Sequence, residues 1–382
     1  MTTWYGDLCG SIGDFGTLIP LTLGMAHRGD IDIGPTFFWG GVWNIFTGWY
    51  FGVPIPVQPM KVIATEQSLT RNEVITSGVL TGLFTGLLGI TGTTNIIKQY
   101  TPSVLIAVIQ FSLGLKMAIT GLTMSLNSNE RLLTLFSAVV LLVGTFLETF
   151  PTAIVLLLTG IIKVLVVHKI TFKVMMPVTS VPVFTIGDFI NGLLKGTLAQ
   201  LPLTVLNSVI SLVELSNELF GPTDMMTIPH VSFSICFMNT FSSFLGAIPS
   251  CHGAGGLASQ YRYGARTGRS MLVLGIFKII VAIFMGYSLN QILDRFPRSV
   301  MGMLLIGSGV ELATHGMKKL PTTNGQGLET HKTVFTISVA TVMATNTFYG
   351  YLIGILLLSL GYLQDRFRVP VNYSIINEVT EL

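Results

Sequence analysis

The chain has 382 residues and a net charge of +3, and only 10% of its residues are charged. Its mean hydropathy is +0.69. Soluble globular domains are about 25% charged, so the composition excludes a soluble core with one anchor and indicates a polytopic membrane protein. The small, scattered charge argues against a nucleic-acid partner. Cys9, Cys236 and Cys251 lie far apart, so they predict neither a disulfide framework nor a metal site.

Apolar segments follow one another along the whole chain, each near the length of about 20 residues that a membrane-spanning helix needs. The segments are 8–26, 36–52, 74–91, 103–124, 132–147, 150–167, 188–214, 231–247, 270–289, 298–314, 333–346 and 347–363. Two shorter segments, near 54–68 and 249–262, are interrupted by glycine, proline and polar residues. Together they predict an all-α fold with about 14 transmembrane elements, of which two are broken half-helices.

The two halves of the chain resemble each other in order along the sequence. Leu18–Thr22 recurs at 200–204, and Asn44-Ile-Phe-Thr recurs 195 residues later as Asn239-Thr-Phe-Ser. The same offset relates Pro102, Gly114, Ala118 and Gly121 to Pro297, Gly309, Ala313 and Gly316. We therefore expect an inverted repeat of seven plus seven elements, over residues 1–185 and 186–382.

An odd number of elements in each repeat inverts the second copy in the membrane. The two broken segments, Gly52–Lys61 and Ala247–Gly268, would then meet N-terminus to N-terminus near the midplane, with Asn44 and Asn239 bracing them. Irregular backbone at this depth belongs inside protein or beside a cavity. Glycines allow a ligand close to the backbone, and free N–H groups at a helix start favour an anion.

These segments carry motifs of a known family. Pro56-Val-Gln-Pro-Met-Lys61 and the long motif over 249–268 resemble the two signatures of the molybdate transporter family, a branch of the sulfate-permease superfamily. Residues 13–20 and 200–208 look like its first and eighth helices. The resemblance covers most of 6–320 and implies core and gate domains, each built from both repeats, and high-affinity molybdate uptake. It also implies that the chain lacks the cytoplasmic STAS domain of larger sulfate permeases.

Molybdate is a tetrahedral dianion with oxygen acceptors only, so its site needs several N–H or O–H donors. Two helix N-termini supply about half a positive charge each, which leaves the remainder to side chains or to a co-transported proton. The candidate substrate-binding residues are Thr17, Gln58, Met60, Lys61, Gln200, Asn207, His252, Gly253, Ala254 and Gly255.

Each of these candidates also has a structural interpretation. Gln58 is a ligand or a helix cap, and His252 is its mirrored donor or a structural histidine. Gln200 and Asn207 lie seven residues apart on one helical face, where interhelical hydrogen bonding is the alternative. The Lys61 ammonium either meets the anion or points to the gate interface or a carboxylate.

Four ionisable residues near the apolar segments are candidates for coupling or gating. Lys116 and Glu311 occupy repeat-equivalent positions and either pair with each other or reach an interface. Asp14 carries a proton or binds a neighbouring helix end. Arg262 is a cytoplasmic anchor or gate, with a basic, anion-attracting lining as the alternative.

The leading hypothesis is a secondary transporter in which the anion lies between the two half-helices. No G-x-x-x-x-G-K-[ST] motif occurs, which argues against ATP-driven pumping. Sulfate or another tetrahedral oxyanion remains open as substrate, whereas a nucleobase would require carboxylates beside the broken segments. An anion channel or a membrane sensor is the alternative of another class, and no catalytic or cofactor constellation indicates an enzyme. We expect an integral protein of the plasma membrane or of an internal membrane such as the vacuole. By analogy with related folds, we expect a homodimer that forms through the gate domain.

Overall fold

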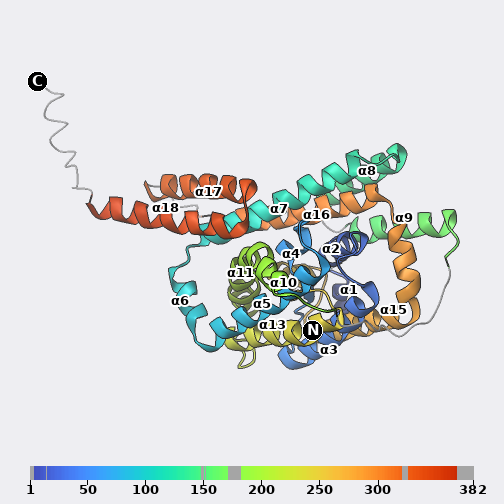
Figure 1. Ribbon diagram of the computed structural model, residues 1–382, viewed down its shortest axis with the longest axis horizontal. Helices are drawn as coiled ribbons and strands as arrows, with labels where there is room; N and C mark the ends of the chain where they lie inside the picture. Colours follow the sequence, from blue (N-terminus) through green and yellow to red (C-terminus); the bar gives the residue numbers. More distant parts are fainter. Residues whose placement is uncertain are drawn as a thin grey trace, which may run out of the picture.

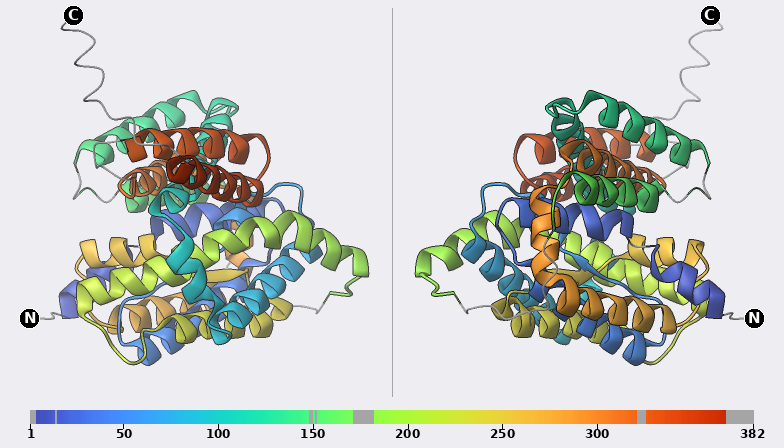
Figure 2. Two further views of the ribbon diagram at one scale, coloured as in Figure 1. Left: turned by 90° about the vertical axis from the view of Figure 1, so that its left-hand side faces the viewer. Right: turned by 90° about the vertical axis from the view of Figure 1, so that its right-hand side faces the viewer.

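The computed structural model describes residues 4–13, 15–147, 150, 152–170, 182–320 and 326–367. These residues form a predominantly helical fold, and Figures 1 and 2 show its helices in two layers. The first layer holds the long helices α7 (Ser103–Leu126), α8 (Arg131–Phe146), α16 (Arg298–Met317), α17 (Gln326–Ala344) and α18 (Thr347–Phe367). In addition, α9 (Thr152–Val167) packs against α8 and α16.

The second layer contains most of the remaining helices and both broken segments. Its helices are α1 (Trp4–Ser11), α2 (Phe15–His27), α3 (Ile33–Phe51), α4 (Lys61–Thr65), α5 (Arg71–Ile90), α10 (Ile186–Asn191), α11 (Leu198–Leu203), α12 (Ser211–Phe220), α13 (Ile228–Ser242), α14 (Ala254–Arg262) and α15 (Arg269–Asp294). The short helix α6 (Thr93–Tyr100) joins α5 to α7 between the layers (Figure 1).

Most predicted apolar segments are confirmed as helices, with ends shifted by a few residues. The segment 8–26 is an exception, because it forms two helices in place of one. In addition, the sequence analysis missed α6, which is short and polar. Among the described residues, four helical stretches are both long and apolar enough to cross a membrane. They are Arg71–Ile90, Ser103–Leu126, Ile186–Phe220 and Arg298–Met317.

The predicted segment near 188–214 is a continuous stretch that alternates α- and π-helix. The π-helical parts are η1 (Gly192–Thr197) and η2 (Thr204–Ile210), and Pro202 lies in the α-helical turn between them. Proline has no N–H to donate and its ring crowds the preceding turn, and π-helical turns occur frequently at functional sites. The irregular helix therefore marks a place where regular α-helical hydrogen bonding is interrupted.

Glycines set a close helix contact between the two halves of the chain. Helices α7 and α16 cross with Gly114 against Gly309 and Gly121 against Gly302. A Cβ atom on Gly309 would lie only 2.5 Å from the Gly114 carbonyl oxygen. Small residues at such crossings allow two backbones to touch in a membrane. The Gly114–Gly309 contact joins positions that the sequence repeat equates, while the division into exactly seven elements each stays a prediction.

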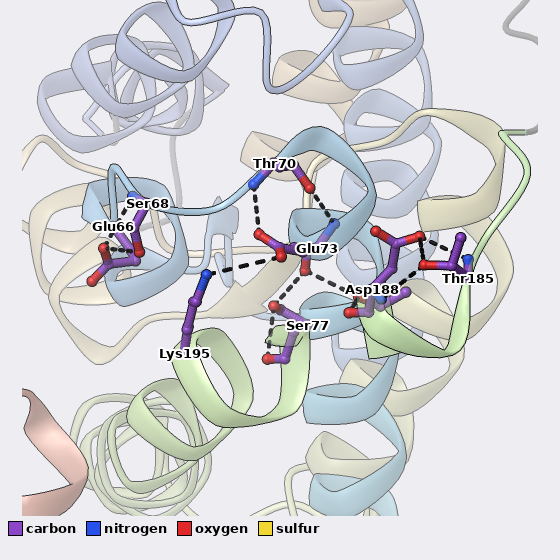
Figure 3. Close-up of polar contacts among 10 residues, drawn as sticks. Glu66, Ser68, Thr70, Glu73, Ser77, Thr185, Asp188 and Lys195 are labelled. Atoms are coloured by element: carbon purple, nitrogen blue, oxygen red, sulfur yellow. Dashed lines mark hydrogen bonds and ion pairs between the residues drawn. The ribbon is translucent and has the colours of Figure 1, made fainter. Parts of the chain in front are cut away.

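Two capping boxes fix the ends of α5 and α10 beside each other (Figure 3). Thr70 and Glu73 cap α5, and Thr185 and Asp188 cap α10 in the same reciprocal way. A capping box satisfies two N–H groups that a helix start leaves open. Thr76 on α5 then joins the two helices, because its Oγ1 donates to Asp188 O at 2.8 Å, and Ser77 Oγ lies 3.0 Å from Gly192 O at the start of η1.

The Gly114–Gly309 crossing should be intolerant of any side chain. We expect Gly309→Ala to lower the free energy of unfolding by about 1–3 kcal/mol, because the added methyl group meets backbone and not a flexible side chain. Gly307→Ala on the same helix is the matched control, since its Cβ would meet only the Leu141 Cδ1 atom at 3.1 Å. Thermal unfolding of the purified variants in detergent measures the difference, and equal midpoints would contradict the assignment.

Candidate functional site

The two broken segments pair with each other as a short antiparallel ribbon. Strand β1 (Val57–Pro59) lies opposite β2 (Ser250–His252), with Val57 facing His252 and Gln58 facing Cys251. The Met60 amide extends the ribbon by donating to Pro249 O at 2.8 Å. All six strand residues are buried, so the non-helical backbone finds its hydrogen-bond partners inside the protein, as membrane depth requires. The sequence predicted that these segments meet, but not that they form strands.

Two asparagines brace the ribbon from the helices that precede each strand. Asn44 Oδ1 on α3 accepts a hydrogen bond from the Val57 amide at 2.9 Å. Asn239 Oδ1 on α13 accepts from the Ser250 amide at 2.8 Å, and its Nδ2 donates to Ser250 O at 2.6 Å. The bracing role predicted for this repeat-related pair is confirmed, because each asparagine binds the first residue of its strand.

A half-helix begins directly after each strand. Helix α4 spans only five residues, and the second of its N–H groups, at Val62, already donates to Gln200 Oε1 at 2.8 Å. The Gln200 Nε2 group donates to Thr204 Oγ1 at 2.9 Å. The structure thus uses Gln200 to hold the start of α4, and the Met60 amide is part of the ribbon. The nine-residue α14 brings the early N–H groups of Ala254 and Gly255, which a helix start leaves without partners inside the helix.

Gln58 links the ribbon to the first turn of α14. Its side chain is 1% exposed, and it lies so close to Gly253 and Gly256 that a Cβ atom on either glycine would collide with its amide. The Gln58 side chain therefore fits in this place only because residues 253 and 256 have no side chain. Gly255, between them, has no heavy atom within 4 Å of its Cβ position.

A cavity of about 50 Å³ lies at the first turns of both half-helices. It exceeds the roughly 10–15 Å³ that one water molecule requires. Elements from both layers form its wall: α2, α4, η2 and α14 on one side, α7 and α16 on the other. The lining residues are Thr17, Lys61, Met117, Asn207, Gly255, Ala258, Ser259, Ser308, Glu311, Leu312 and His315.

Five residues singled out by the sequence analysis thus meet at one cavity. Thr17, Lys61, Asn207 and Gly255 were predicted as substrate ligands, and Glu311 was predicted for coupling or gating. They come from five separate elements, far apart along the chain. Glu311 is exposed, whereas Lys61 is 5% exposed.

Sequence reasoning missed several residues of this wall and its support. Gln110 on α7 donates from Nε2 to Asn207 Oδ1 at 2.6 Å, so the Asn207 Nδ2 group is the part of that amide left for an anion. A glutamine inside the apolar segment 103–124 was the available signal. His315 lies four residues after Glu311, on the same helical face.

Other predicted residues lie away from the cavity wall. His252 is fully buried, with Nε2 3.0 Å from Ser234 Oγ and Nδ1 3.5 Å from Pro56 O. Both ring nitrogens therefore face protein groups, and His252 does not line the cavity. Among the described residues, Lys116 and Glu311 form no ion pair with each other, and the Lys116 Nζ atom donates to Thr345 O at 3.4 Å. Arg262 lies near enough for its charge to act on Glu311. Asp14 lies outside the described residues.

Comparison with known proteins decides the family. The family model described as "Molybdate transporter of MFS superfamily" matches residues 6–117 and 192–312.

The chain belongs to the molybdate transporter family.

Curated relatives agree with this molybdate transporter assignment. Molybdate transporter 1 of Arabidopsis thaliana is 33% identical, over 80% of this chain and 78% of the relative. Molybdate transporter 1 of Chlamydomonas reinhardtii is 26% identical, over 82% and 83%.

The fold resembles that of sulfate-permease-type anion transporters. The transmembrane domain of the cyanobacterial bicarbonate transporter BicA matches with a TM-score of 0.60 and 16% identity, over 92% of this chain and 96% of that chain. SLC26A9 matches with a TM-score of 0.69 and 15% identity, over 95% and 66%. This likeness confirms the predicted all-α membrane fold, and the family match together with the long apolar helices confirms the multi-pass membrane location.

Two adjacent glycines in this molybdate transporter family member allow a matched test of the Gln58 seat. We expect Gly256→Ala to lower the unfolding temperature, because its methyl group collides with Gln58. Gly255→Ala should keep the unfolding temperature, since its methyl group enters open space. Thermal unfolding of the two purified variants measures the difference, and an unaltered Gly256→Ala protein would contradict this placement of Gln58.

Proposed function

We propose that this protein is a secondary-active molybdate transporter, and that the oxyanion binds in the cavity at the first turns of α4 and α14. The observation that carries the proposal is the convergence of Thr17, Lys61, Asn207 and Gly255 on that one cavity. A hydroxyl, an ammonium, an amide and a helix start are all groups that donate to oxygen. The names of the Arabidopsis and Chlamydomonas relatives support molybdate as the substrate.

The transport mechanism that fits this wall is alternating access. One side of the cavity belongs to the layer that carries the ribbon, and the other side belongs to α7 and α16. We assign the first set to the core domain and the second to the gate domain. A movement of the core against the gate then opens and closes the cavity while the anion stays with the half-helices.

Molybdate uptake into proteoliposomes tests this function, with Asn207→Ala as the decisive variant. We expect saturable uptake in the wild type and a loss of at least tenfold in molybdate affinity in the variant, because a buried donor to a charged ligand is removed. The neighbouring Ser208→Ala is the control, since Ser208 is equally buried but does not line the cavity.

The outcomes distinguish the alternatives. Equal competition by sulfate would make the protein a general tetrahedral-oxyanion carrier. Flux that grows without saturation would indicate a channel, and unchanged affinity in Asn207→Ala would mean that the cavity is not the site.

We further propose that Glu311 is the coupling group. Its carboxylate lies in the wall of an anion site, where a dianion repels it and favours its protonated form. The charged or titratable groups that face it are Lys61 on α4, Arg262 on α14 and His315 on its own helix. Binding of the anion and uptake of a proton then stabilise each other, which gives proton-coupled import.

The pH dependence of uptake tests the role of Glu311. Wild-type uptake should rise as the external pH falls, because protonated Glu311 removes the repulsion. Glu311→Gln should make uptake nearly independent of pH and should retain molybdate exchange across the membrane. Glu214→Gln is the control, since Glu214 does not line the cavity and its carboxylate forms an ion pair with Lys98 at 2.9 Å. An unchanged pH profile in Glu311→Gln would refute the assignment.

A further inference from the structure

A buried glutamine of the first layer is bonded to a proposed ligand of the anion. Gln110 of α7 is fully buried, and its Nε2 group donates to Asn207 Oδ1 of η2 at 2.6 Å. This hydrogen bond crosses from the first layer to the second, and Asn207 also lines the cavity. The Gln110 Oε1 atom has no hydrogen-bond partner among the described residues. A buried amide that is only half satisfied costs free energy, so its presence in α7 calls for a role.

A second hydrogen bond joins the same two surfaces. Lys319, just after the end of α16, donates from Nζ to Ser211 Oγ of α12 at 2.9 Å. Ser211 follows Asn207 by four residues, which is about one turn of the continuous helix that η2 and α12 form. Helix α16 also passes close to Gln110, since a Cβ atom on Gly316 would lie 2.9 Å from the Gln110 Cβ atom. Gln110 and Lys319 therefore hold neighbouring turns of one helix, through two interlayer hydrogen bonds.

The bond from Gln110 also decides which end of the Asn207 side chain meets the cavity. A primary amide has an acceptor oxygen on one end and an NH₂ donor group on the other. Because Gln110 occupies Oδ1, the two N–H donors of Asn207 Nδ2 are left for the oxygen atoms of an anion. An amide turned the other way would present an oxygen lone pair, which repels an oxyanion. Gln110 thus acts on the anion through Asn207, without lining the cavity itself.

We propose that Gln110 couples the anion site to the gate: it orients the Asn207 amide toward the anion and, together with the Lys319–Ser211 bond, holds the first layer against the second. The proposal rests on the anion cavity and the alternating access proposed above. A movement of one layer past the other breaks both interlayer hydrogen bonds, so these bonds stabilise the arrangement seen here. The movement also releases the Asn207 amide from its orientation, so the anion is held best while the gate is in this position. Gln110 is a positioning residue.

The distance between the two layers tests the coupling without any anion. Spin labels on keto-bearing residues that replace Trp49 of α3 and Leu132 of α8 report this distance by electron paramagnetic resonance, since both positions are exposed, at 73% and 85%. We expect Gln110→Met and Lys319→Met each to raise the ratio of a second distance to the main distance by about fivefold, which corresponds to the net contribution of one hydrogen bond.

Molybdate calorimetry on the purified full-length variants separates the two tasks of the interlayer bonds. Gln110→Met should weaken molybdate binding by about fivefold, because the Asn207 amide can then turn its oxygen toward the anion. Lys319→Met should change the affinity by less than about twofold, since Lys319 contacts Ser211 and not Asn207.

Two neighbouring residues provide matched controls. Ser112→Ala changes a buried side chain of α7 that does not line the cavity, and Lys318→Met removes an exposed lysine next to Lys319. Both controls should leave the distance ratio and the molybdate affinity unchanged.

The outcomes decide the proposal separately from the function. An unchanged distance ratio in Gln110→Met and Lys319→Met, even with a lowered unfolding temperature, would overturn the proposal and leave the two bonds as ordinary packing. Unchanged molybdate affinity in Gln110→Met would overturn the orienting role and with it the coupling. If Gln110→Met fails to fold, Gln110→Asn, whose amide is one methylene too short to reach Asn207, must give the same two results. A wild type that neither binds nor transports molybdate would instead refute the proposed function, whereas the distance ratios need no anion.

Discussion

The structure depends on one constraint, which is that broken backbone inside a membrane must find hydrogen-bond partners within the protein. The ribbon of Val57–Pro59 and Ser250–His252 meets this constraint by pairing the two breaks with each other. Asn44 and Asn239 then satisfy the first amide of each strand. Because the breaks satisfy one another, both half-helices start at a defined place, and a polar cavity at membrane depth follows from that placement.

The same constraint explains why several polar residues of the broken segments are not in the cavity wall. Gln200 is used at the start of α4, and His252 is held between Ser234 and Pro56. These side chains fix the geometry of the site. The groups that line the cavity come largely from neighbouring helices, such as Thr17 on α2 and Asn207 on η2. Under the proposed function, side chains of these helices meet the anion, while the ribbon holds the two half-helices beside them.

The sequence predicted the helices, the breaks and their meeting, because apolar length, glycine and proline are local signals. It also singled out five of the residues that line the cavity, since polar groups and glycines stand out in apolar segments. It did not predict which face of the ribbon each residue occupies, and so it treated Gln58 and His252 as equivalent donors. It missed Lys278 and Gln110, because each bonds to a partner on another element. Lys278 donates to the Val57 carbonyl, and Gln110 donates to the Asn207 amide oxygen. Such partners come from chain crossings that a single sequence does not display.

The ribbon and the glycine crossing also limit how the molecule can move. Hydrogen bonds between β1 and β2 tie the two half-helices together, so neither can shift alone without exposing backbone groups. The contact of Gly114 with Gly309 ties α7 to α16 just as closely. The cavity lies between these two tied pairs, with Lys61 and Gly255 on one and Met117 and Glu311 on the other. Under the proposed mechanism, the movement that costs the least free energy is therefore the two half-helices sliding past α7 and α16. This movement alters the cavity and leaves the ribbon and the glycine crossing intact.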